Sequence, residues 1–296
     1  MALMIENTIG DHNAFKNFYQ GVPQEQWELL IRFRATHLPR QLEIGGVRWK
    51  YLTGGQKGAA LLLLPGAIGR GEVAFRHILE LEDDYRLIVP DYPLIPTVDR
   101  LLSGLVSLLD SEGMKSVALI GGSMGGGMAQ CLVRKYPDRI DKLILSHTGV
   151  PNPERARMSN LGMNVLRLLP TWVFHKALKW EISRLLSTAK DEKPFWQAYF
   201  KELTAGLSKE EWISRYQCAI DLERHYTFAP GDLAGWTGRI LILESDNDSI
   251  IKAPERAALK ALYPQAHVHT FIGAGHGASL IKREEYLSVI RAFLRT

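Results

Sequence analysis

Apolar and polar positions divide most of the chain into short strand-length runs separated by helix-length segments. The apolar runs cover residues 61–64, 86–89, 117–120, 142–145, 240–243 and 268–272. Two of them, Leu61-Leu62-Leu63-Leu64 and Ile240-Leu241-Ile242-Leu243, are continuous rather than alternating, which is typical of strands buried on both faces. Strands that alternate with helices predict right-handed crossovers and a mainly parallel sheet. The pattern therefore predicts an α/β protein.

The stretch before these runs has a different pattern. Residues 41–44 and 47–52 flank Gly45-Gly46, the signature of a β-hairpin with a two-residue turn. Apolar side chains between residues 11 and 38 recur at a helix-like spacing. We therefore expect an N-terminal helical lead-in over residues 1–40, followed by an antiparallel pair of strands.

The alternation of strands and helices stops between residues 151 and 230. This stretch is helical in pattern, without a convincing strand, and holds four of the seven tryptophans, namely Trp172, Trp180, Trp196 and Trp212. Aromatic side chains at helical spacing either pack into a core or face a pocket, and the sequence leaves both open. We expect a core formed by residues 41–150 and 231–296 and a helical cap over residues 151–230.

Composition narrows the class of protein. The chain has 296 residues, of which 46% are hydrophobic and 23% charged, as in an ordinary globular protein. Its formal charge of +4 comes without a dense Lys/Arg block, so no nucleic-acid partner is expected. The most apolar run, residues 59–64, is stopped by Pro65-Gly66, and neither a secretion signal nor a membrane span is expected.

Cysteine usage bears on metal binding and on location. Cys131 and Cys218 are far apart and lack a C-x-x-C spacing, which favours neither a disulfide framework nor a zinc site. We expect reduced thiols and a cytoplasmic protein. The pattern does not predict an oligomeric state.

A glycine-rich stretch supplies the first candidate for chemistry. Gly121-Gly122-Ser123-Met124-Gly125-Gly126 follows the run 117–120 and precedes a helix-like segment. A serine on a sharp strand-to-helix turn needs residues without side chains two positions before and after it, here Gly121 and Gly125. The helix that follows aims its N-terminal amides and dipole at an oxyanion. Ser123 is thus a candidate nucleophile, although such loops also form simple turns.

A nucleophilic serine needs a base to accept its proton and an acid to orient that base. In parallel sheets, such residues follow the carboxyl ends of strands. Asp246 and Asp248 follow the run 240–243, and His276 lies in the glycine-rich loop after the last run. Three further histidines are weaker candidates: His147, His267 and His269.

The chain order Ser, Asp, His resembles that of the α/β-hydrolases. The resemblance covers about residues 40–150 and 236–296 and includes the apolar pair 250–251 after the acid. It implies an α/β-hydrolase fold with a helical cap and a triad of Ser123, Asp248 and His276. The acid is usually the last one before the apolar pair, which selects Asp248 over Asp246.

The resemblance also implies an oxyanion hole made of two backbone amides. One is the amide of Met124, directly after the serine, and the other comes from the loop after the first parallel strand. This chain has Pro65-Gly66-Ala67 there, where many members carry His-Gly. The glycine is kept, and the second donor would be the Ala67 N–H.

The expected activity is that of a carboxylesterase-like serine hydrolase. Ser123 would attack a carboxylic ester or related acyl substrate and form an acyl-enzyme, without a metal or organic cofactor. The aromatic, mildly basic cap suggests an apolar pocket for a small-molecule acyl substrate, either a hydrophobic ester or one that carries a carboxylate. Acyl length and leaving group stay open, because the same triad serves ester, thioester, lactone, amide and carbon–carbon bond hydrolysis.

Two other functions compete with this one. The Pro-Gly-Ala loop and Tyr92-Pro93 give a weaker resemblance to maspardin-like relatives, which are thought to be non-catalytic binding proteins with incomplete triads. The presence of His276 in Gly-Ala-Gly-His-Gly departs from that pattern. The stretch 69–74 also matches G-x-G-x-x-A, with Asp91 in the ribose-binding position of an NAD-dependent oxidoreductase. However, residues 65–68 separate the strand from its first glycine, where that fingerprint needs a tight turn.

Overall fold

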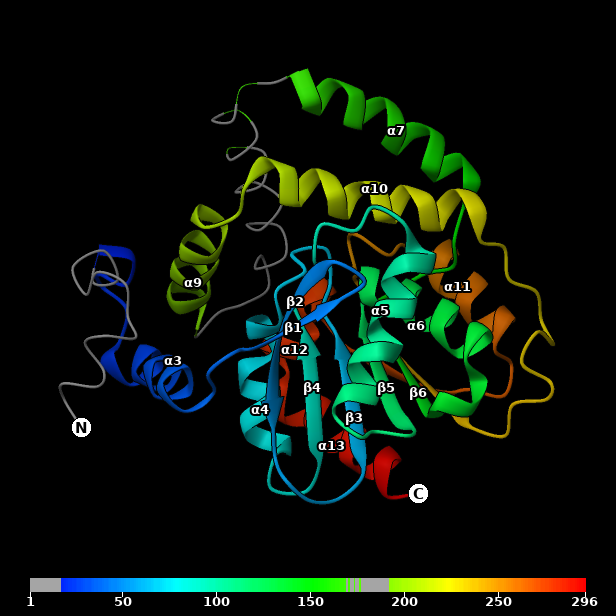
Figure 1. Ribbon diagram of the computed structural model, residues 1–296, viewed down its shortest axis with the longest axis horizontal. Helices are drawn as coiled ribbons and strands as arrows, with labels where there is room; N and C mark the ends of the chain where they lie inside the picture. Colours follow the sequence, from blue (N-terminus) through cyan, green and yellow to red (C-terminus); the bar gives the residue numbers. More distant parts are fainter. Residues whose placement is uncertain (1–16, 169, 171–172, 174–175, 177–191) are drawn as a thin grey trace.

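A computed structural model describes residues 17–168, 170, 173, 176 and 192–296. At its centre is an eight-stranded sheet with the order β1-β2-β4-β3-β5-β6-β7-β8 (Figure 1). Its strands are β1 (Arg40–Ile44), β2 (Val47–Gly54), β3 (Ala60–Leu64), β4 (Arg86–Pro90), β5 (Val117–Gly122), β6 (Ile140–Ser146), β7 (Arg239–Ser245) and β8 (His267–Phe271). Residues 1–16 of the predicted lead-in, and Trp172 and Trp180 of the predicted cap, lie outside the described residues.

The strand pairing follows the prediction. β1 and β2 form the expected antiparallel hairpin, with Ile44 opposite Val47. β2 also pairs antiparallel with β4, and every pair from β4 to β8 is parallel. Each of the six apolar runs is a strand, with ends shifted by a residue or two, which is the usual uncertainty of element boundaries. The prediction of a mainly parallel α/β sheet is confirmed.

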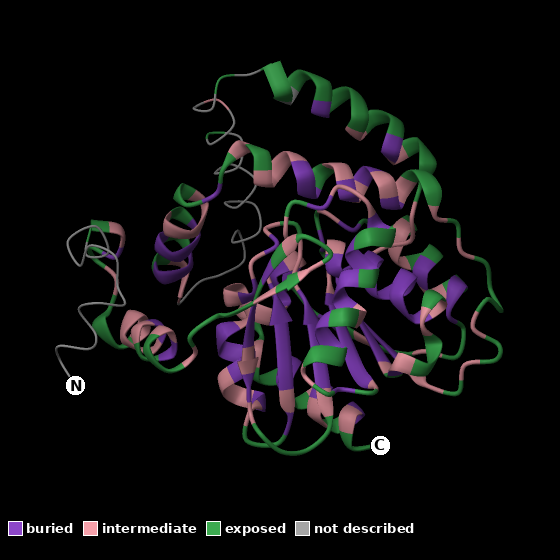
Figure 2. Ribbon diagram, viewed as in Figure 1, coloured by how far each residue is buried: buried purple, intermediate pink, exposed green. Residues whose placement is uncertain are grey.

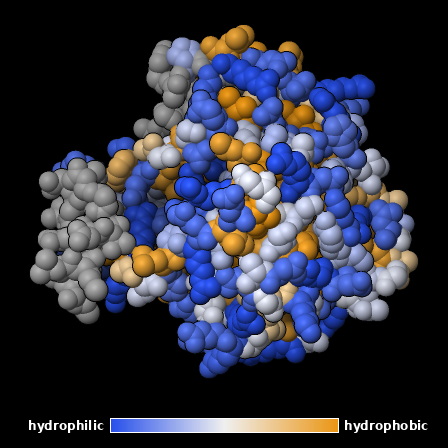
Figure 3. All heavy atoms as spheres, viewed as in Figure 1, coloured by the Kyte–Doolittle hydropathy of each residue, from blue (hydrophilic) through white to orange (hydrophobic). Residues whose placement is uncertain are grey.

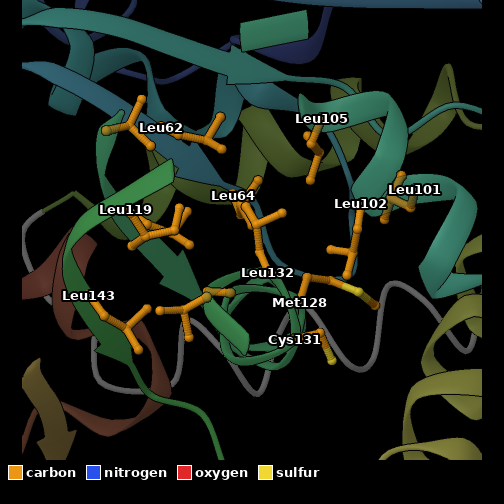
Figure 4. Packing of buried hydrophobic residues seen from close by; sticks show 14 of the residues in the cluster. Leu62, Leu64, Leu101, Leu102, Leu105, Leu119, Met128, Cys131, Leu132 and Leu143 are labelled. Carbon is orange, nitrogen blue, oxygen red and sulfur yellow. The ribbon is translucent and has the colours of Figure 1, made fainter. Parts of the chain in front are cut away.

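Helices cover both faces of this sheet. They are α3 (Gln24–Thr36), α4 (Phe75–Leu81), α5 (Val98–Ser111), α6 (Met124–Lys135), α11 (Ala253–Leu262), α12 (Ala278–Ile281) and α13 (Arg283–Arg295), with short 3₁₀ helices η1 (Gly71–Ala74), η2 (Pro137–Arg139) and η3 (Gly275–Gly277). Successive strand side chains point to opposite faces, so a continuous apolar run feeds two cores. Leu61 and Leu63 belong to the cluster that includes α4 and α13, whereas Leu62 and Leu64 belong to the one that includes α5 and α6. Strands β3 to β7 are accordingly buried along most of their length (Figure 2), whereas the edge strands β1 and β8 are mostly exposed or half-buried. Leu62, Leu64 and Leu119 lie toward α5 and α6 (Figure 4).

Between β6 and β7 the chain forms α7 (Pro153–Leu168), α9 (Lys193–Ala205) and α10 (Lys209–His225). α7 and α10 contact each other and cross above the sheet (Figure 1). α10 begins with a capping box in which the Ser208 hydroxyl accepts from Glu211 N, and Ser208 N donates to the Glu211 carboxylate. One side of α7 exposes apolar side chains, and orange atoms gather where this helix lies in Figure 3. They are Met158, Leu161, Val165 and Leu168.

α9 carries an aromatic cluster into the core. Its aromatic side chains Phe195, Trp196 and Tyr199 are buried against Phe75 of α4, with ring centroids 6.0 to 6.2 Å from the Phe75 ring. The Arg76 guanidinium lies 4.9 Å from the centre of the Trp196 ring, a favourable cation–π distance. Trp196 is therefore a packing residue of the core and does not face a pocket, two alternatives that the sequence left open.

Arg34 of α3 links two segments that are distant in sequence. Its Nη2 lies 2.6 Å from Glu72 Oε1 in η1, and its Nη1 lies 2.8 Å from Glu202 Oε1 in α9. The Tyr19 hydroxyl donates to the same Glu202 carboxylate at 2.6 Å. All three charged side chains are about three-quarters buried, so water screens these ion pairs less than it screens fully exposed ones. α3 thereby links α9 to η1.

Two further expectations concern membranes and thiols. Within the part of the chain that the structure describes, no helix combines the length and apolar character needed to cross a bilayer. Cys131 and Cys218 are both buried and unpaired.

Candidate active site

Ser123 occupies a strained turn between β5 and α6. Its φ of 51° and ψ of −119° are rare for a residue with a side chain and cost about 1–3 kcal/mol. The turn is this tight because backbones pass very close: a Cβ on Gly121 would lie 2.4 Å from the Gly125 carbonyl oxygen, and one on Gly125 would lie 2.3 Å from that of Leu64. The two glycines predicted from the sequence are therefore sterically required.

The loop after β3 lies beside this turn. A Cβ built on Gly66 would be 3.5 Å from Ser123 Cβ, which places the Pro65-Gly66-Ala67 stretch next to the serine. The loop is held by the Tyr92 hydroxyl, which donates to the Pro65 carbonyl at 2.9 Å. Ala67 and Met124, the two predicted oxyanion donors, line one cavity. Met124 begins α6, where backbone N–H groups lack partners within the helix.

Asp248 and His276 are brought together by the loops after β7 and β8. His276 Nδ1 lies 2.8 Å from Asp248 Oδ2, while Asp248 Oδ1 accepts the amides of Ile250 and Ile251 at 2.8 and 3.0 Å. Burial alone would favour the neutral carboxyl, but His276 and the two amides outweigh it and hold the Asp248 pKa below its ordinary value. An ionised Asp248 accepts a hydrogen bond from the Nδ1–H of His276, so the neutral ring keeps its proton on Nδ1 and leaves Nε2 as its acceptor.

The neighbouring residues Asp246 and Asn247 have a different role. Asp246 Oδ1 accepts the Gly273 amide and Asn247 Oδ1 accepts the Gly275 amide, both at 2.8 Å. These bonds join the loop after β7 to the loop that carries His276. Of the two candidate acids, Asp248 contacts the imidazole and Asp246 supports the backbone around it.

His147, one of the weaker candidates, lies behind His276. Its buried ring hydrogen-bonds to Ser146 Oγ at 3.0 Å and to Ser245 Oγ at 2.9 Å, and its centroid is 5.9 Å from that of His276. Burial, followed by the charge of His276, lowers the His147 pKa to about 3, so this ring stays neutral. The sequence did indicate that His147 lies near the site, because it directly follows a strand. Its strained φ of 47° is seen only in the structure.

His147 also connects the serine turn to the His276 loop. The Ser123 amide donates to the Ser146 carbonyl at 2.9 Å, and the next residue, His147, contacts His276 edge to face. The described hydrogen bonds include none between Ser123 Oγ and His276. Catalytic hydrogen bonds are often long before substrate binds and shorten in the complex.

A cavity of about 190 Å³ lies between the serine turn and the helices α7 and α10. Its walls are Ala67 and Met124 from the core, Arg155 and Ser159 from α7, and Trp212, Arg215, Tyr216, Ala219, Ile220 and Glu223 from α10. A larger hollow of about 320 Å³ lies along α13, but its walls contain none of the predicted site residues and are formed in part by paired charges such as Glu80 and Arg291. The cap cavity is therefore the candidate substrate pocket.

The glycine-rich stretch 69–74 does not form a dinucleotide site of the usual kind. It is a loop followed by the four-residue η1 rather than a tight turn into a long helix. Asp91 Oδ1 accepts the Gly71 amide at 2.7 Å, and Asp91 Oδ2 pairs with Arg70 at 3.1 Å. The predicted ribose-binding acid is thus engaged in holding this loop. Among the described residues, no three His, Cys, Asp or Glu side chains are grouped as metal ligands.

Residues 105–282 match the family model for the alpha/beta hydrolase fold, which is more than half of the chain. The chain belongs to the α/β-hydrolase family. Solved α/β-hydrolase structures agree with this one in fold: a hydrolase from Pseudomonas aeruginosa PA01 superposes with a TM-score of 0.73 at 17% identity, covering 88% of this chain and 99% of that one. An enol-lactonase from Burkholderia xenovorans LB400 gives a TM-score of 0.72 at 17% identity, covering 87% of this chain and 100% of that one.

Curated relatives of this α/β-hydrolase are similar at low identity. The sn-1-specific diacylglycerol lipase ABHD11 of Mus musculus is 24% identical over 200 residues, which span 66% of this chain and 64% of the lipase, less than two thirds of its length. Esterase YbfF of Escherichia coli is 23% identical over 231 residues, which cover 77% of this chain and 87% of the esterase. These relatives are hydrolases, and they support a hydrolase activity for this member of the family.

Proposed function

We propose that this α/β-hydrolase is a serine hydrolase of the carboxylesterase type that forms an acyl-enzyme on Ser123. The observation that carries the proposal is the 2.8 Å contact between His276 Nδ1 and the buried, ionised Asp248. Such a pair fixes the imidazole with Nε2 as its acceptor, which is what a general base for a serine hydroxyl requires. The pair lies at the same edge of the sheet as the strained Ser123 turn.

In the proposed reaction, Ser123 Oγ forms a bond to the acyl carbon while His276 Nε2 takes the hydroxyl proton. The carbonyl electrons move onto oxygen, where the amides of Ala67 and Met124 stabilise the oxyanion. The intermediate then expels the alcohol, which takes the proton from His276. Water, deprotonated by the same nitrogen, then attacks the acyl carbon, the bond from that carbon to Ser123 Oγ breaks, and His276 returns the proton to Oγ as the acid leaves.

The cavity supports a small, largely apolar acyl group. Trp212, Tyr216 and Ile220 contribute much of the α10 wall, and a volume of about 190 Å³ is below the usual range for drug-sized ligands. The printed names of the relatives include an esterase and a lipase, which agrees with an ester substrate.

The cysteines do not compete with Ser123 as nucleophiles. Burial raises the pKa of the Cys218 thiol to about 12, and burial also raises that of Cys131, so both stay protonated at neutral pH. Their unpaired state supports our further proposal that the protein works in a reducing compartment such as the cytoplasm.

A non-catalytic binding protein is the second candidate function. It is favoured by the lack of a described hydrogen bond between Ser123 Oγ and His276. On that hypothesis the cavity would hold an acyl compound without cleaving it.

Labelling by a fluorophosphonate distinguishes the two functions. The wild-type protein should be labelled at Ser123, located by mass spectrometry of the labelled peptide, and should hydrolyse p-nitrophenyl butyrate. Ser123→Ala should lose both properties, whereas Ser159→Ala, which changes another serine of the same cavity, should be labelled normally. A wild-type protein that is neither labelled nor active on activated esters would refute the serine-hydrolase proposal.

A further inference from the structure

Arg215 is the buried cation of the candidate pocket whose N–H donors have the fewest hydrogen-bond partners. It lies in α10, is 3% exposed and lines the cavity together with Ala67 and Met124. Its Nη1 donates to the carbonyl of Ile68, the residue after Ala67. Among the described residues, its Nε and Nη2 have no hydrogen-bond partner.

These two nitrogens form one edge of the guanidinium. Nε–H and Nη2–H point in parallel, and this edge is the one that holds a carboxylate through two hydrogen bonds. Gly69 does not block it: a Cβ on Gly69 would lie 2.6, 2.9 and 3.0 Å from Nε, Cδ and Cζ. Distances so nearly equal place Gly69 above the flat face of the guanidinium and leave its edge uncovered by this residue.

Among the described residues, the carboxylate that forms an ion pair with Arg215 also serves other partners. Glu211 Oε1 is 3.5 Å from Arg215 Nη2 but only 2.6 Å from Arg70 Nη2. Its other oxygen accepts the Ser208 amide at 2.9 Å as part of the helix cap. Glu211 therefore partly balances the charge of Arg215, while the Nε and Nη2 donors of Arg215 still lack hydrogen-bond acceptors.

Arg155, the other arginine of the cavity, has closer ion pairs: its Nε also lacks a hydrogen bond, but it lies 2.9 Å from Glu223 Oε1, against 3.5 Å between Arg215 Nη2 and Glu211 Oε1. Its guanidinium is ion-paired with Glu223 and Glu255 and also donates to the Val150 carbonyl. Leaving donors of a buried charged group without acceptors costs more than leaving neutral ones, so a ligand that supplies acceptors to Arg215 gains affinity. Burial, together with the charge of Arg70, lowers the Arg215 pKa to about 10, and the group is still charged at neutral pH.

We propose that Arg215 binds a carboxylate of the substrate through its Nε and Nη2, so that the preferred substrates are half-esters of short dicarboxylic acids. This inference rests on the proposed hydrolase function and specifies its substrate class. A cavity of about 190 Å³ holds roughly six water volumes of ~30 Å³ each, which limits the acyl chain to a few carbons. Since Arg215 holds Ile68, next to the proposed oxyanion donor Ala67, the carboxylate lies close to the reacting carbonyl.

The test compares a matched pair of esters. The kcat/KM of wild-type protein is measured for mono-p-nitrophenyl glutarate and for the uncharged p-nitrophenyl valerate, and the ratio of the two is followed. We expect a ratio of roughly 10- to 100-fold in favour of the charged ester, the size of one charge-assisted bidentate contact. Arg215→Lys keeps the charge but loses the fork, and should bring the ratio down toward one, mainly through KM.

Two controls separate binding from structural support. Arg155→Lys makes the same exchange at the internally paired arginine and should leave the ratio unchanged. If Arg215 only positioned the loop at Ile68, Arg215→Lys would lower both kcat/KM values together and keep the ratio. That result, a wild-type ratio near one, or an equal fall of the ratio in Arg155→Lys would overturn the proposal.

Binding of glutarate supplies a readout that does not depend on catalysis. Calorimetric titration of Ser123→Ala with glutarate should show binding that weakens at least tenfold in Ser123→Ala combined with Arg215→Lys. If neither ester is hydrolysed and Ser123 is not labelled, while glutarate binding still depends on Arg215, the hydrolase proposal fails and the carboxylate site stands. If glutarate does not bind although the uncharged ester is hydrolysed, the carboxylate site fails and the hydrolase stands.

Discussion

The exchange Asp248→Asn tests how the acid sets the tautomer of His276. Asp248 Oδ1 accepts two backbone amides, from Ile250 and Ile251, at 2.8 and 3.0 Å. An asparagine keeps these bonds only if its carbonyl oxygen takes this position, and its NH₂ group then faces His276 Nδ1. The NH₂ donates to Nδ1, so the ring proton moves to Nε2, the atom that must accept the serine proton.

The magnitude follows from the alternative orientation of the asparagine. Turning the asparagine to restore the productive tautomer would leave the partly buried Ile250 amide and the buried Ile251 amide without acceptors, at about 1–3 kcal/mol each. The productive tautomer is therefore disfavoured by about 2–6 kcal/mol, or roughly 30- to 10⁴-fold. Loss of the Asp248 charge also destabilises the imidazolium, and we expect kcat on p-nitrophenyl butyrate to fall by about 10³-fold or more.

The matched control is Asp246→Asn. Asp246 is exposed and accepts one amide, from Gly273 at 2.8 Å, through an oxygen that asparagine also has. We expect its kcat to stay within about threefold of wild type, with circular dichroism confirming that both variants fold. If Asp248→Asn kept more than a tenth of the wild-type kcat, or if Asp246→Asn were equally damaging, the assignment of the acid would be wrong.

Three further predictions concern stability. Gly125→Ala places a methyl group 2.3 Å from a carbonyl oxygen and should lower the free energy of unfolding, measured by urea titration, by several kcal/mol. A methyl group at Gly122 meets nothing within 4 Å, so Gly122→Ala should cost less than about 1 kcal/mol, and similar losses in the two variants would contradict the steric argument. Burial lowers the His77 pKa from 6.5 to about 4, so the folded state binds fewer protons than the unfolded state between these pH values. The free energy of unfolding should therefore fall by about 3 kcal/mol as the pH falls from 6.5 through 4. His77→Phe should abolish this fall, and an unchanged pH dependence in that variant would refute the role of His77. Arg34→Met removes the ion-pair partner of the partly buried Glu72 and Glu202 carboxylates. It should lower the melting temperature by an amount that corresponds to about 1–3 kcal/mol of stability, whereas Arg32→Met, at an exposed position, should have little effect.

Local patterns predicted the sheet and the residues of the candidate site, because both depend on short stretches of sequence. Runs such as residues 240–243 are strands since their side chains are apolar on both faces, and the glycines around Ser123 are dictated by backbone contacts within the same turn. Asp248 and His276 follow strands that pair side by side, so they meet at one edge of the sheet.

The surroundings of the site were beyond sequence analysis because they depend on contacts between distant segments. Arg215 looks like any helical arginine until α10 is placed over the Ile68 carbonyl, which leaves part of the guanidinium without acceptors. Trp196 and Trp212 share a helical pattern, but one is buried in the core and the other lines the cavity. Only the packing of the cap against the sheet distinguishes them.

The bridge formed by Arg34 has a consequence for how the chain folds during synthesis. Its partners Glu72 and Glu202 are separated in sequence, and Glu202 is made by the ribosome long after α3 has emerged. Until then, α3 can pair with η1 alone, and the apolar face that carries Leu30 and Phe33 lacks the aromatic residues of α9. Contacts of such high sequence separation require a long loop to close, which makes them slow to form. Final docking of α3 therefore waits for the cap, and a nascent chain halted before Glu202 should expose α3 to proteases.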